Sequence, residues 1–352
     1  MMNSPRDKLK KDKTASVASP PVRLKQLAAH LGLNPATVSL VLNDVPGRSI
    51  PQATRDRIKA AAKALNYQPN LVARSLQSSR TQTVGILLPE LGEGYHTQIM
   101  SGIGNQLLGA GYFYFTAHHH HQKDLVEEYA RMLIGRGAQG ILAIDTQFDH
   151  PLSVPVVAVA GHRRLAGITN VCLDHERAVE LALEHLYRLG HRKIAFMRGR
   201  TESSDTDSRW TALRKITAKM GLKIIPELVV HLDGEMDSPE AGPRMVQQLL
   251  GSKRAFTALF AFNDIAAIGS ISALQNSNLR VPADVSVIGF DNIKATEYTS
   301  PRLTTISQNL DEIGKIATQC LLNRLHGTAL SMKDITIEPK LVIRESTGIA
   351  RS

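Results

Sequence analysis

From Thr83 onward the sequence alternates short apolar runs with longer segments of helical periodicity, and this alternation restricts the fold more than any other property of the chain. Apolar strands separated by helices are typical of parallel sheets that are covered on both faces. Because the runs form two consecutive series, we expect an α/β core of two doubly wound parallel-sheet subdomains. The expected strands are TVGILL, YFYFT, GILAI and VPVVAVA, then HRKIAFM, ELVVHL, TALFAF and VSVIGF, with helices near 96–109 and 123–135.

The first quarter of the chain has a purely helical pattern. Leucine and alanine recur on one face of the segment LKQLAAHLG, which Gly32 ends. A second helix begins after Asn34, a favoured N-cap, with Pro35 in its first turn. A third helix follows in PQATRDRIKAAAKALNY, with Ile58 facing inward. Two short helices joined by a tight turn predict a helix-turn-helix domain.

The excess of positive charge is confined to this quarter. Residues 1–82 hold 14 Lys and Arg against 4 Asp and Glu, whereas residues 83–352 hold 28 of each. A basic helical domain joined to a neutral core indicates an anionic partner for the first and another kind of ligand for the second. The alternatives are a solubilising tail without a partner, or a helical domain that contacts proteins. We read residues 1–21 as a disordered basic tail without a signal peptide or membrane span.

The second helix of a helix-turn-helix enters the major groove of DNA. Thr37 and Ser39 offer hydroxyl groups for phosphates or bases, and Ala36 and Leu40 offer methyl groups for thymine. The residues of this domain that we expect to contact DNA are Asn34, Pro35, Ala36, Thr37, Ser39, Leu40, Asn43 and Arg55.

The stretch VRLKQLAAHLGLNPATVSLVLND, followed by TRDRIKAAAKALNYQPNLVARSLQSSRTQTVGILLP, resembles the LacI/GalR family of bacterial transcription regulators. The resemblance runs from about Val22 to Gly348. It implies a core like that of periplasmic binding proteins and a cytoplasmic repressor controlled by a small-molecule effector. It also implies a homodimer on a palindromic double-stranded DNA operator. Two residues depart from the family: Leu40 stands where many members carry arginine, and Pro51 replaces the serine that usually opens the third helix.

The resemblance also assigns a role to the linker, residues 70–82. In the family this segment becomes a hinge helix on operator DNA and lies in the minor groove beside its dimer mate. Leu76 then occupies the position of a leucine that wedges into a base step. The alternative is an ordinary apolar residue in a linker. The other residues expected to contact DNA here are Asn70, Ala73 and Arg74.

Ligands of doubly wound sheets bind beyond the carboxyl ends of the strands. This rule selects Asn263 and Asp264 after LFAF, and Asp291 after SVIGF. The resemblance adds Arg209 as an effector-clamping side chain and Tyr95 as an aromatic ring that stacks on the effector. An arginine fork and carboxylates suit vicinal hydroxyls or ring nitrogens. The alternatives are helix capping for Asn263 and Asp291, and a structural role for Asp264.

The resemblance favours a sugar or sugar derivative as effector, with a nucleobase or nucleoside second. Glu93 and Gly94 replace the asparagine and proline that are usual in the family, so the cavity is expected to differ from those of well-known members. Control by a protein partner is a further alternative.

Motifs for catalysis, cofactors and metals are missing from the sequence. The glycines of GIGNQLLGAG do not follow a strand as a dinucleotide fingerprint requires, and Cys172 and Cys320 lack metal-ligand spacing. We read the histidines of residues 118–121 as a solvated loop rather than a zinc or nickel site. We therefore expect no enzyme, cofactor or membrane partner. A solute-binding protein with the same two-lobed core is the alternative, and the helix-turn-helix argues against it.

The expected organisation divides the core between two subdomains. No leucine heptads follow the core, which favours a dimer over a tetramer. The expected ranges are tail 1–21, helix-turn-helix 22–69, linker 70–82, and effector-binding and dimerisation core 83–352, with an N-subdomain of about 83–161 and 292–325 and a C-subdomain of about 162–291 and 326–345.

Overall fold

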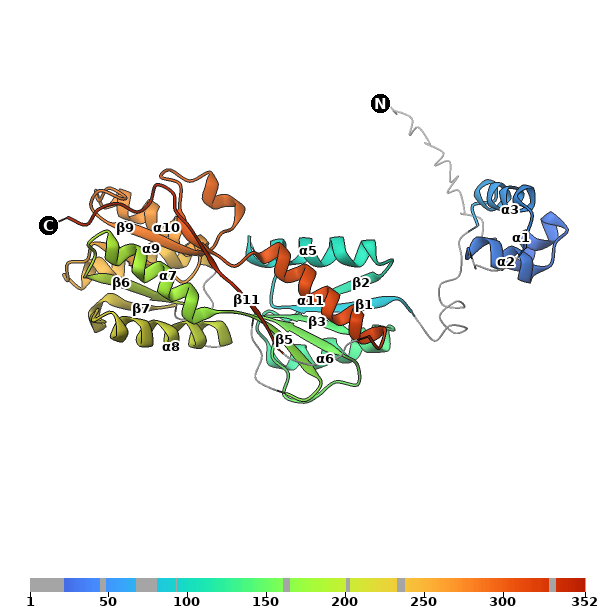
Figure 1. Cartoon of the computed structure of the whole chain (residues 1–352), viewed down its shortest axis with the longest axis horizontal. Coiled ribbons are helices and arrows are strands. Elements are labelled where there is room, and N and C mark those ends of the chain that lie inside the picture. The colour runs from blue at the N-terminus through green and yellow to red at the C-terminus, as the bar shows by residue number, and fades with distance from the viewer. Residues whose placement is uncertain are drawn as a thin grey trace, which may run out of the picture. The chain divides into compact units, whose positions relative to one another are not determined.

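A computed structural model of the chain (Figure 1) describes residues 22–44, 49–67, 81–92, 94–160, 165–200, 203–232, 238–328 and 334–351. The chain divides into two compact units, residues 1–81 and 82–352. Within the described ranges, no helix is long and apolar enough to cross a membrane. The predicted tail and the linker residues Asn70, Ala73, Arg74 and Leu76 lie outside the described residues.

The first unit contains α1 (Leu24–Leu31), α2 (Pro35–Leu42) and α3 (Gln52–Ala64). Gly32 ends α1 in the left-handed conformation, with a φ of 64°. The side chain of Asn34 accepts a hydrogen bond from the amide of Ala36 and so begins α2. Leu27, Val38 and Ile58 bring the helices together in a small core from which solvent is excluded. The prediction of a helical N-terminal domain is therefore confirmed.

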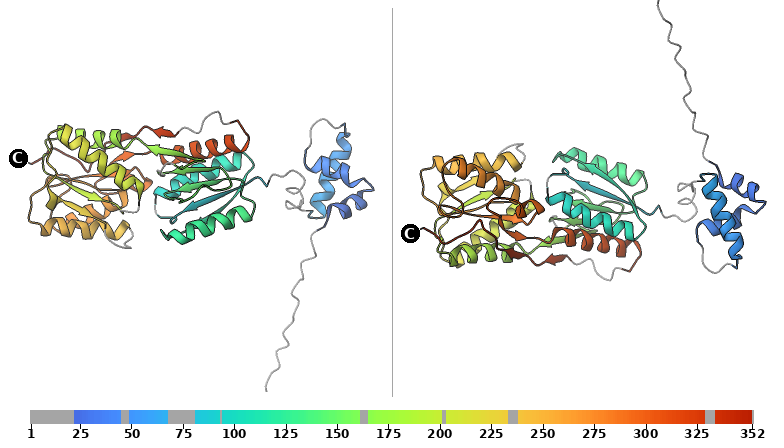
Figure 2. Two further views of the ribbon diagram at one scale, coloured as in Figure 1. Left: turned by 90° about the horizontal axis from the view of Figure 1, so that it is seen from below. Right: turned by 90° about the horizontal axis from the view of Figure 1, so that it is seen from above.

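The first lobe of the second unit is a parallel sheet in the order β11-β5-β4-β3-β1-β2. Helices α5 (Tyr95–Gly109) and α11 (Leu310–Leu325) cover one face, and α6 (Lys123–Gly135) covers the other (Figures 1 and 2). The strands are β1 (Thr83–Leu88), β2 (Phe113–His118), β3 (Ile141–Ile144), β4 (Val156–Val159), β5 (Ile168–Leu173) and β11 (Ile335–Ile337).

The second lobe is a sheet in the order β12-β10-β9-β8-β6-β7, parallel except for its antiparallel edge strand β12. Helices α7 (His175–Arg188) and α8 (Ser204–Lys219) cover one face, and α9 (Ser238–Gly251) and α10 (Asp264–Asn276) cover the other (Figure 2). The strands are β6 (Ile194–Arg198), β7 (Val229–His231), β8 (Ala258–Phe260), β9 (Ser286–Asp291), β10 (Thr304–Ser307) and β12 (Lys340–Val342), with 3₁₀ turns at Pro226–Leu228 and Lys294–Glu297. Two doubly wound lobes were predicted, and the prediction is confirmed.

The predicted boundaries between the lobes are wrong. Strand β5 was placed with the C-subdomain but pairs with β4 in the first lobe. Strand β10 was placed with the N-subdomain but pairs with β9 in the second lobe, and β11 returns to β5. Over the described elements, the chain crosses between lobes after β5, after β10 and after β11. Local apolarity marks a strand without saying which sheet it joins, because pairing depends on distant residues.

Two close backbone approaches hold the helices in place. A Cβ atom on Gly102 of α5 would lie 2.0 Å from the carbonyl oxygen of Asp311 in α11, and one on Gly314 would lie 2.2 Å from that of Ile99. The two helices therefore pack backbone to backbone over the first sheet. At the start of α5, Gly94 has a φ of 89° and faces Ile293, which follows β9 of the second lobe.

Candidate functional site: the second helix and the cavity between the lobes

Of the described residues predicted to contact DNA, all except Arg55 of α3 lie on α2 and its borders. Val38 and Val41 form the buried side of this helix, while Ala36 and Asn43 are exposed. The side chains of Pro35, Thr37, Ser39 and Leu40 are half-buried. Contact with DNA stays a prediction for all of them. Helix α2 has a length and an exposed side that are compatible with binding in the major groove.

Two of the predicted contact residues also have structural hydrogen bonds. Asn43 donates from Nδ2 to the carbonyl oxygen of Ser39 at 2.9 Å and so ties the end of α2 to its last turn. Arg55 donates from Nε to the carbonyl oxygen of Ile50 at 3.3 Å, at the start of α3. Each of these two side chains therefore uses at least one of its donors for a hydrogen bond within the domain.

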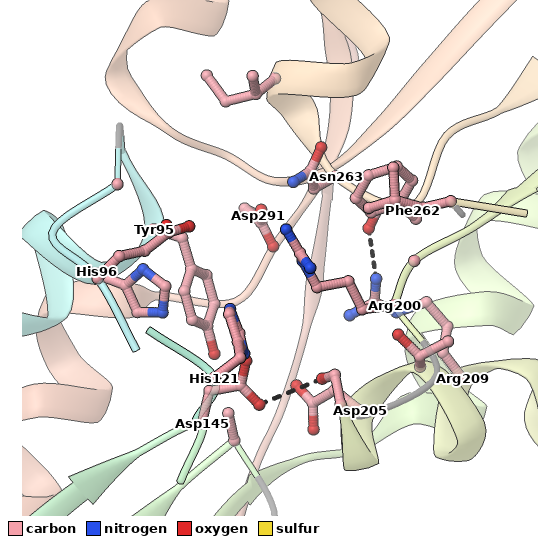
Figure 3. Close-up of a pocket in the computed structure, with 18 of the residues that line it drawn as sticks. Tyr95, His96, His121, Asp145, Arg200, Asp205, Arg209, Phe262, Asn263 and Asp291 are labelled. Atoms are coloured by element: carbon pink, nitrogen blue, oxygen red, sulfur yellow. Dashed lines mark hydrogen bonds between the residues drawn. The ribbon is translucent and has the colours of Figure 1, made fainter. Parts of the chain in front are cut away.

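A cavity of about 490 Å³ lies between the two lobes (Figure 3). Its walls come from the carboxyl ends of parallel strands in both sheets, as expected for doubly wound folds. Helices contribute Tyr95, His96, Asp205 and Arg209, and the side chains that line it at the end of a strand or within three residues after one are Glu90, Asp145, Arg200, Asn263 and Asp291.

Tyr95, in the first turn of α5, lines the side of this cavity that the first lobe forms (Figure 3). Burial raises the pKa of its phenol well above the usual value of 10, and the charges of Asp205, Asp145 and Asp291 raise it further. The phenol therefore lies among carboxylates that come from both lobes. Its ring gives the cavity an aromatic face of the kind that stacks on a sugar or a base.

Arg209 of α8 is held rigidly in the cavity wall. Its guanidinium carbon lies 3.6 Å from the centre of the Phe290 ring, and Nη1 donates to the carbonyl oxygen of Phe262. Its charge also acts on Asp205 and Asp291. Sequence reasoning alone gave no reason to place this side chain in the cavity, and the family resemblance did so.

The carboxylate of Asp205 is held ionised by its neighbours. His175 Nε2 lies 3.2 Å from Asp205 Oδ1. Burial acts to raise the pKa of Asp205, but His175 and Arg209 outweigh it, and the pKa lies below its usual value. His175 begins α7 directly after the crossing from β5, so this contact joins the cavity to a connection between the lobes.

Asp145 and Asp291 are different, because their pKa values are raised. Burial and the charge of Asp205 raise the pKa of Asp145 to about 7. Burial and the neighbouring Asp264 raise the pKa of Asp291 well above its usual value. Asp145 accepts a hydrogen bond from Ser203 Oγ of the other lobe at 3.2 Å, so the two lobes meet directly at the cavity (Figure 3).

Comparisons with known proteins agree with both halves of this description. The family model "Bacterial regulatory proteins, lacI family" matches residues 23–70, and "Periplasmic binding protein-like domain" matches residues 183–347. The HTH-type transcriptional repressor PurR of Erwinia tasmaniensis is 31% identical over 334 residues, which cover 92% of this chain and 96% of that protein. The chain belongs to the LacI family. It is a transcriptional repressor of that family and not an enzyme.

Other relatives and solved structures of the LacI family are similar along nearly the whole chain. PurR of Aliivibrio fischeri is 31% identical over 331 residues, covering 92% of this chain and 97% of that protein. The lac repressor dimer bound to operator and the anti-inducer ONPF has a TM-score of 0.81 at 25% identity, covering 94% of this chain and 100% of that one. A CelR–cellobiose complex has a TM-score of 0.69 at 26% identity, covering 92% and 99%.

Asp264 does not line the cavity of this LacI-family core, against the prediction that it contacts the effector. It is completely buried, and its carboxylate accepts hydrogen bonds from the amide of Ile293 at 2.8 Å and from Thr305 Oγ1. Burial raises its pKa to about 7. Asn263 next to it lines the cavity and also caps α10, since its Oδ1 accepts from the amide of Ala266 at 2.8 Å.

The histidines of residues 118–121 do not form a solvated loop. His119 is 3% exposed, and its Nε2 lies 2.9 Å from Thr146 Oγ1. His121 lines the cavity together with His96. Burial, with neighbouring imidazoles, lowers the pKa of both His96 and His119 to about 4, so both are neutral at pH 7. The described residues include no group of three or more ligands placed to hold a metal ion.

Sequence reasoning missed several side chains of the cavity. Asp145 directly follows the predicted strand GILAI, so the rule that selected Asp291 was sufficient to find it. Arg200 follows β6 by two residues, within reach of the same rule. Asp205 lies on α8, away from a strand end, and His96 carried no signal other than its place beside Tyr95.

Proposed function

We propose that this LacI-family repressor binds a roughly palindromic operator as a homodimer, in the bacterial cytoplasm, through α2 and the linker 70–82. A small molecule that binds in the cavity changes that affinity. The observation that carries the proposal is the contact between Asp145 and Ser203, which come from different lobes and line one cavity. A ligand placed there acts on both lobes at once, and a change in their arrangement alters the start of β1, where the linker joins the core.

A sugar or sugar derivative is the first candidate for the effector. Carboxylates of the cavity accept hydrogen bonds from hydroxyl groups, and the fixed guanidinium of Arg209 donates to them. The solved CelR–cellobiose complex has the same fold and gives independent support. A nucleobase or nucleoside is the second candidate, because the ring of Tyr95 offers a face for stacking.

The dimer is supported by an apolar surface at the edge of the first lobe. Strand β2 is the edge strand of its sheet, and Phe113 on it is 62% exposed. Phe115 lies two residues further on the same strand, and its ring packs edge-on against that of Phe113. Leu108, at the end of α5, is 79% exposed. An unpaired strand edge with exposed aromatic rings is suited to pairing with a second copy.

The proposal is tested by separating DNA binding from effector response. Operator sequences are first selected from random double-stranded DNA with the full chain, and affinity is measured by fluorescence anisotropy with and without candidate effectors. We expect Thr37→Ala to lose about tenfold in operator affinity, since one base contact is worth about 1–3 kcal/mol, and to keep its effector affinity. We expect Asp291→Asn to keep operator affinity in the absence of effector and to lose the response.

Two results contradict the proposal. One is the absence of any enriched DNA sequence. The other is an Asp291→Asn variant whose operator affinity still changes with effector as in the unmodified protein, because the cavity then does not carry the signal.

A further inference from the structure

The cavity contains more carboxylates than cations. Among the lining residues that the structure describes, the carboxylates are Glu90, Asp145, Asp205 and Asp291, and the guanidinium groups are Arg200 and Arg209. Negative charge is in excess when every group is ionised, and burial together with neighbouring carboxylates raises the pKa of Asp145 and Asp291, so protonation removes part of this excess when no ligand is bound. A ligand that brings positive charge would remove this imbalance.

The partners of these carboxylates show which of their charges are balanced within the protein. Asp205 faces His175 and the charge of Arg209, and its pKa is lowered accordingly. Asp145 accepts from the hydroxyl of Ser203 at 3.2 Å, and Asp291 accepts from the amide of Gln308 at 2.6 Å. Both of these donors are neutral, so they satisfy an oxygen atom without cancelling its charge.

The carboxylates converge on one part of the cavity. The phenol of Tyr95 is influenced electrostatically by Asp205, Asp145 and Asp291 together. All three side chains line the same cavity as its ring (Figure 3). A cation in that space would be close to each carboxylate and to the face of the aromatic ring, an arrangement that attracts ammonium groups.

We propose that the effector carries a protonated amine, and that its ammonium group lies beside Tyr95 among Asp145, Asp205 and Asp291. The inference rests on the proposed function, because it takes the cavity as the effector site. An ammonium supplies three N–H donors and one positive charge to a ring of acceptors. The described residues include no group of three or more ligands placed to hold a metal ion. An amino sugar combines the ammonium with the hydroxyl groups expected above.

A protonated amine and a neutral ligand leave different signatures in the pH dependence of binding. The pKa of Asp145 is about 7 because of burial and Asp205, and Arg200 and Arg209 act against this rise. A bound cation favours the ionised carboxylate, so binding releases a proton and affinity rises between pH 6 and pH 7 by up to about fivefold. A ligand without charge draws no such gain from ionisation.

The experiment compares matched pairs of compounds on the full chain. Glucosamine, galactosamine, mannosamine and 1,4-diaminobutane are tested beside glucose, galactose, mannose and 1,4-butanediol, by thermal shift and then by isothermal titration at pH 6 and pH 7. We expect at least one amine to bind about tenfold more tightly than its hydroxyl counterpart, as one charge-assisted contact implies. Titration in two buffers of different ionisation enthalpy measures the released proton.

Single substitutions test which carboxylates produce the preference for the amine. Asp145→Asn, which keeps the shape of the side chain, is expected to remove the preference for the amine, and Asp205→Asn provides a second test at another wall. Asp149→Asn is the matched control, because Asp149 lies outside the cavity and pairs with Lys123 at 2.7 Å. It is expected to retain the full preference.

The outcomes separate this inference from the proposed function. Binding of neutral compounds alone, lost in Asp291→Asn, overturns the amine and leaves the effector cavity standing. Equal preference for the amine in Asp145→Asn and the unmodified protein also overturns it. If no compound of either set binds while operator binding is intact, the amine is overturned and the cavity loses its support as an effector site.

Discussion

At the scale of single residues, Asp145 links the two lobes, and its ionisation lowers the stability of the folded protein. Its carboxyl group is buried opposite Asp205, and its pKa of about 7 in the folded protein compares with about 3.9 for an exposed aspartate. The unfolded chain therefore loses this proton at lower pH than the folded protein does. The stability tied to the protonated group is complete below about pH 4 and is lost as the pH rises to about 7.

This sign leads to a prediction for Asp145→Asn in the absence of ligand. The amide cannot ionise, so the variant should melt at a higher temperature than the unmodified protein at pH 8 and close to it at pH 4, where the carboxyl group is protonated in both the folded and the unfolded chain. A difference of one in pKa corresponds to about 1.4 kcal/mol, or about 2–4 °C in a core of this size. Scanning calorimetry at both pH values measures it, with Asp149→Asn as control. An equal change at both pH values would show that ionisation is not the cause.

Single residues also show how far the site followed from the sequence. Asp291 and Asn263 were found because both lie at the carboxyl end of an apolar run that forms a buried strand, and Asp145 satisfies the same rule. Asp264 was assigned wrongly, because one residue further along α10 turns the side chain inward, toward Ile293. The place of Asp205 depends on how α8 packs against the second sheet, which local sequence does not encode.

At the scale of elements, the crossing of α5 and α11 fixes the first lobe. Gly102 and Gly314 let the two backbones touch, and α5 also carries Tyr95 into the cavity. The strands that the sequence predicted are those with long apolar runs. Strands β5, β10 and β11 were assigned to the wrong lobe, because their partners are set by the crossings between sheets.

We predict that Gly102→Ala destabilises the core. Its Cβ would meet the backbone of Asp311 at 2.0 Å, and backbone cannot move aside as a side chain does. Overpacking of this kind costs about 1–3 kcal/mol, which urea denaturation followed by circular dichroism measures. Gly109→Ala, in the last turn of the same helix, is the control, since its Cβ would have nothing within 4 Å. Equal stability of the two variants would contradict the close approach.

At the scale of the whole molecule, the exposed edge of the first lobe bears on assembly. We predict that Phe113→Asp converts the proposed dimer to a monomer in sedimentation velocity at micromolar concentration, because a charge replaces an apolar ring that is 62% exposed in a single chain. Operator affinity should fall with it, since two half-sites are then bound independently. Met132→Asp on α6, where the side chain is 40% exposed, is the control. A Phe113→Asp dimer as stable as the unmodified one would place the interface elsewhere.

The repeated passage of the chain between the lobes has a genetic consequence. Each lobe is assembled from separate stretches of sequence, so a single exchange between two related genes inside the core joins strands from different parents in one sheet. The helical unit is one continuous stretch that ends at Thr81, and one exchange near that codon transfers it whole. Recognition of DNA can therefore be inherited as a module, whereas the cavity has to change by substitutions made in place.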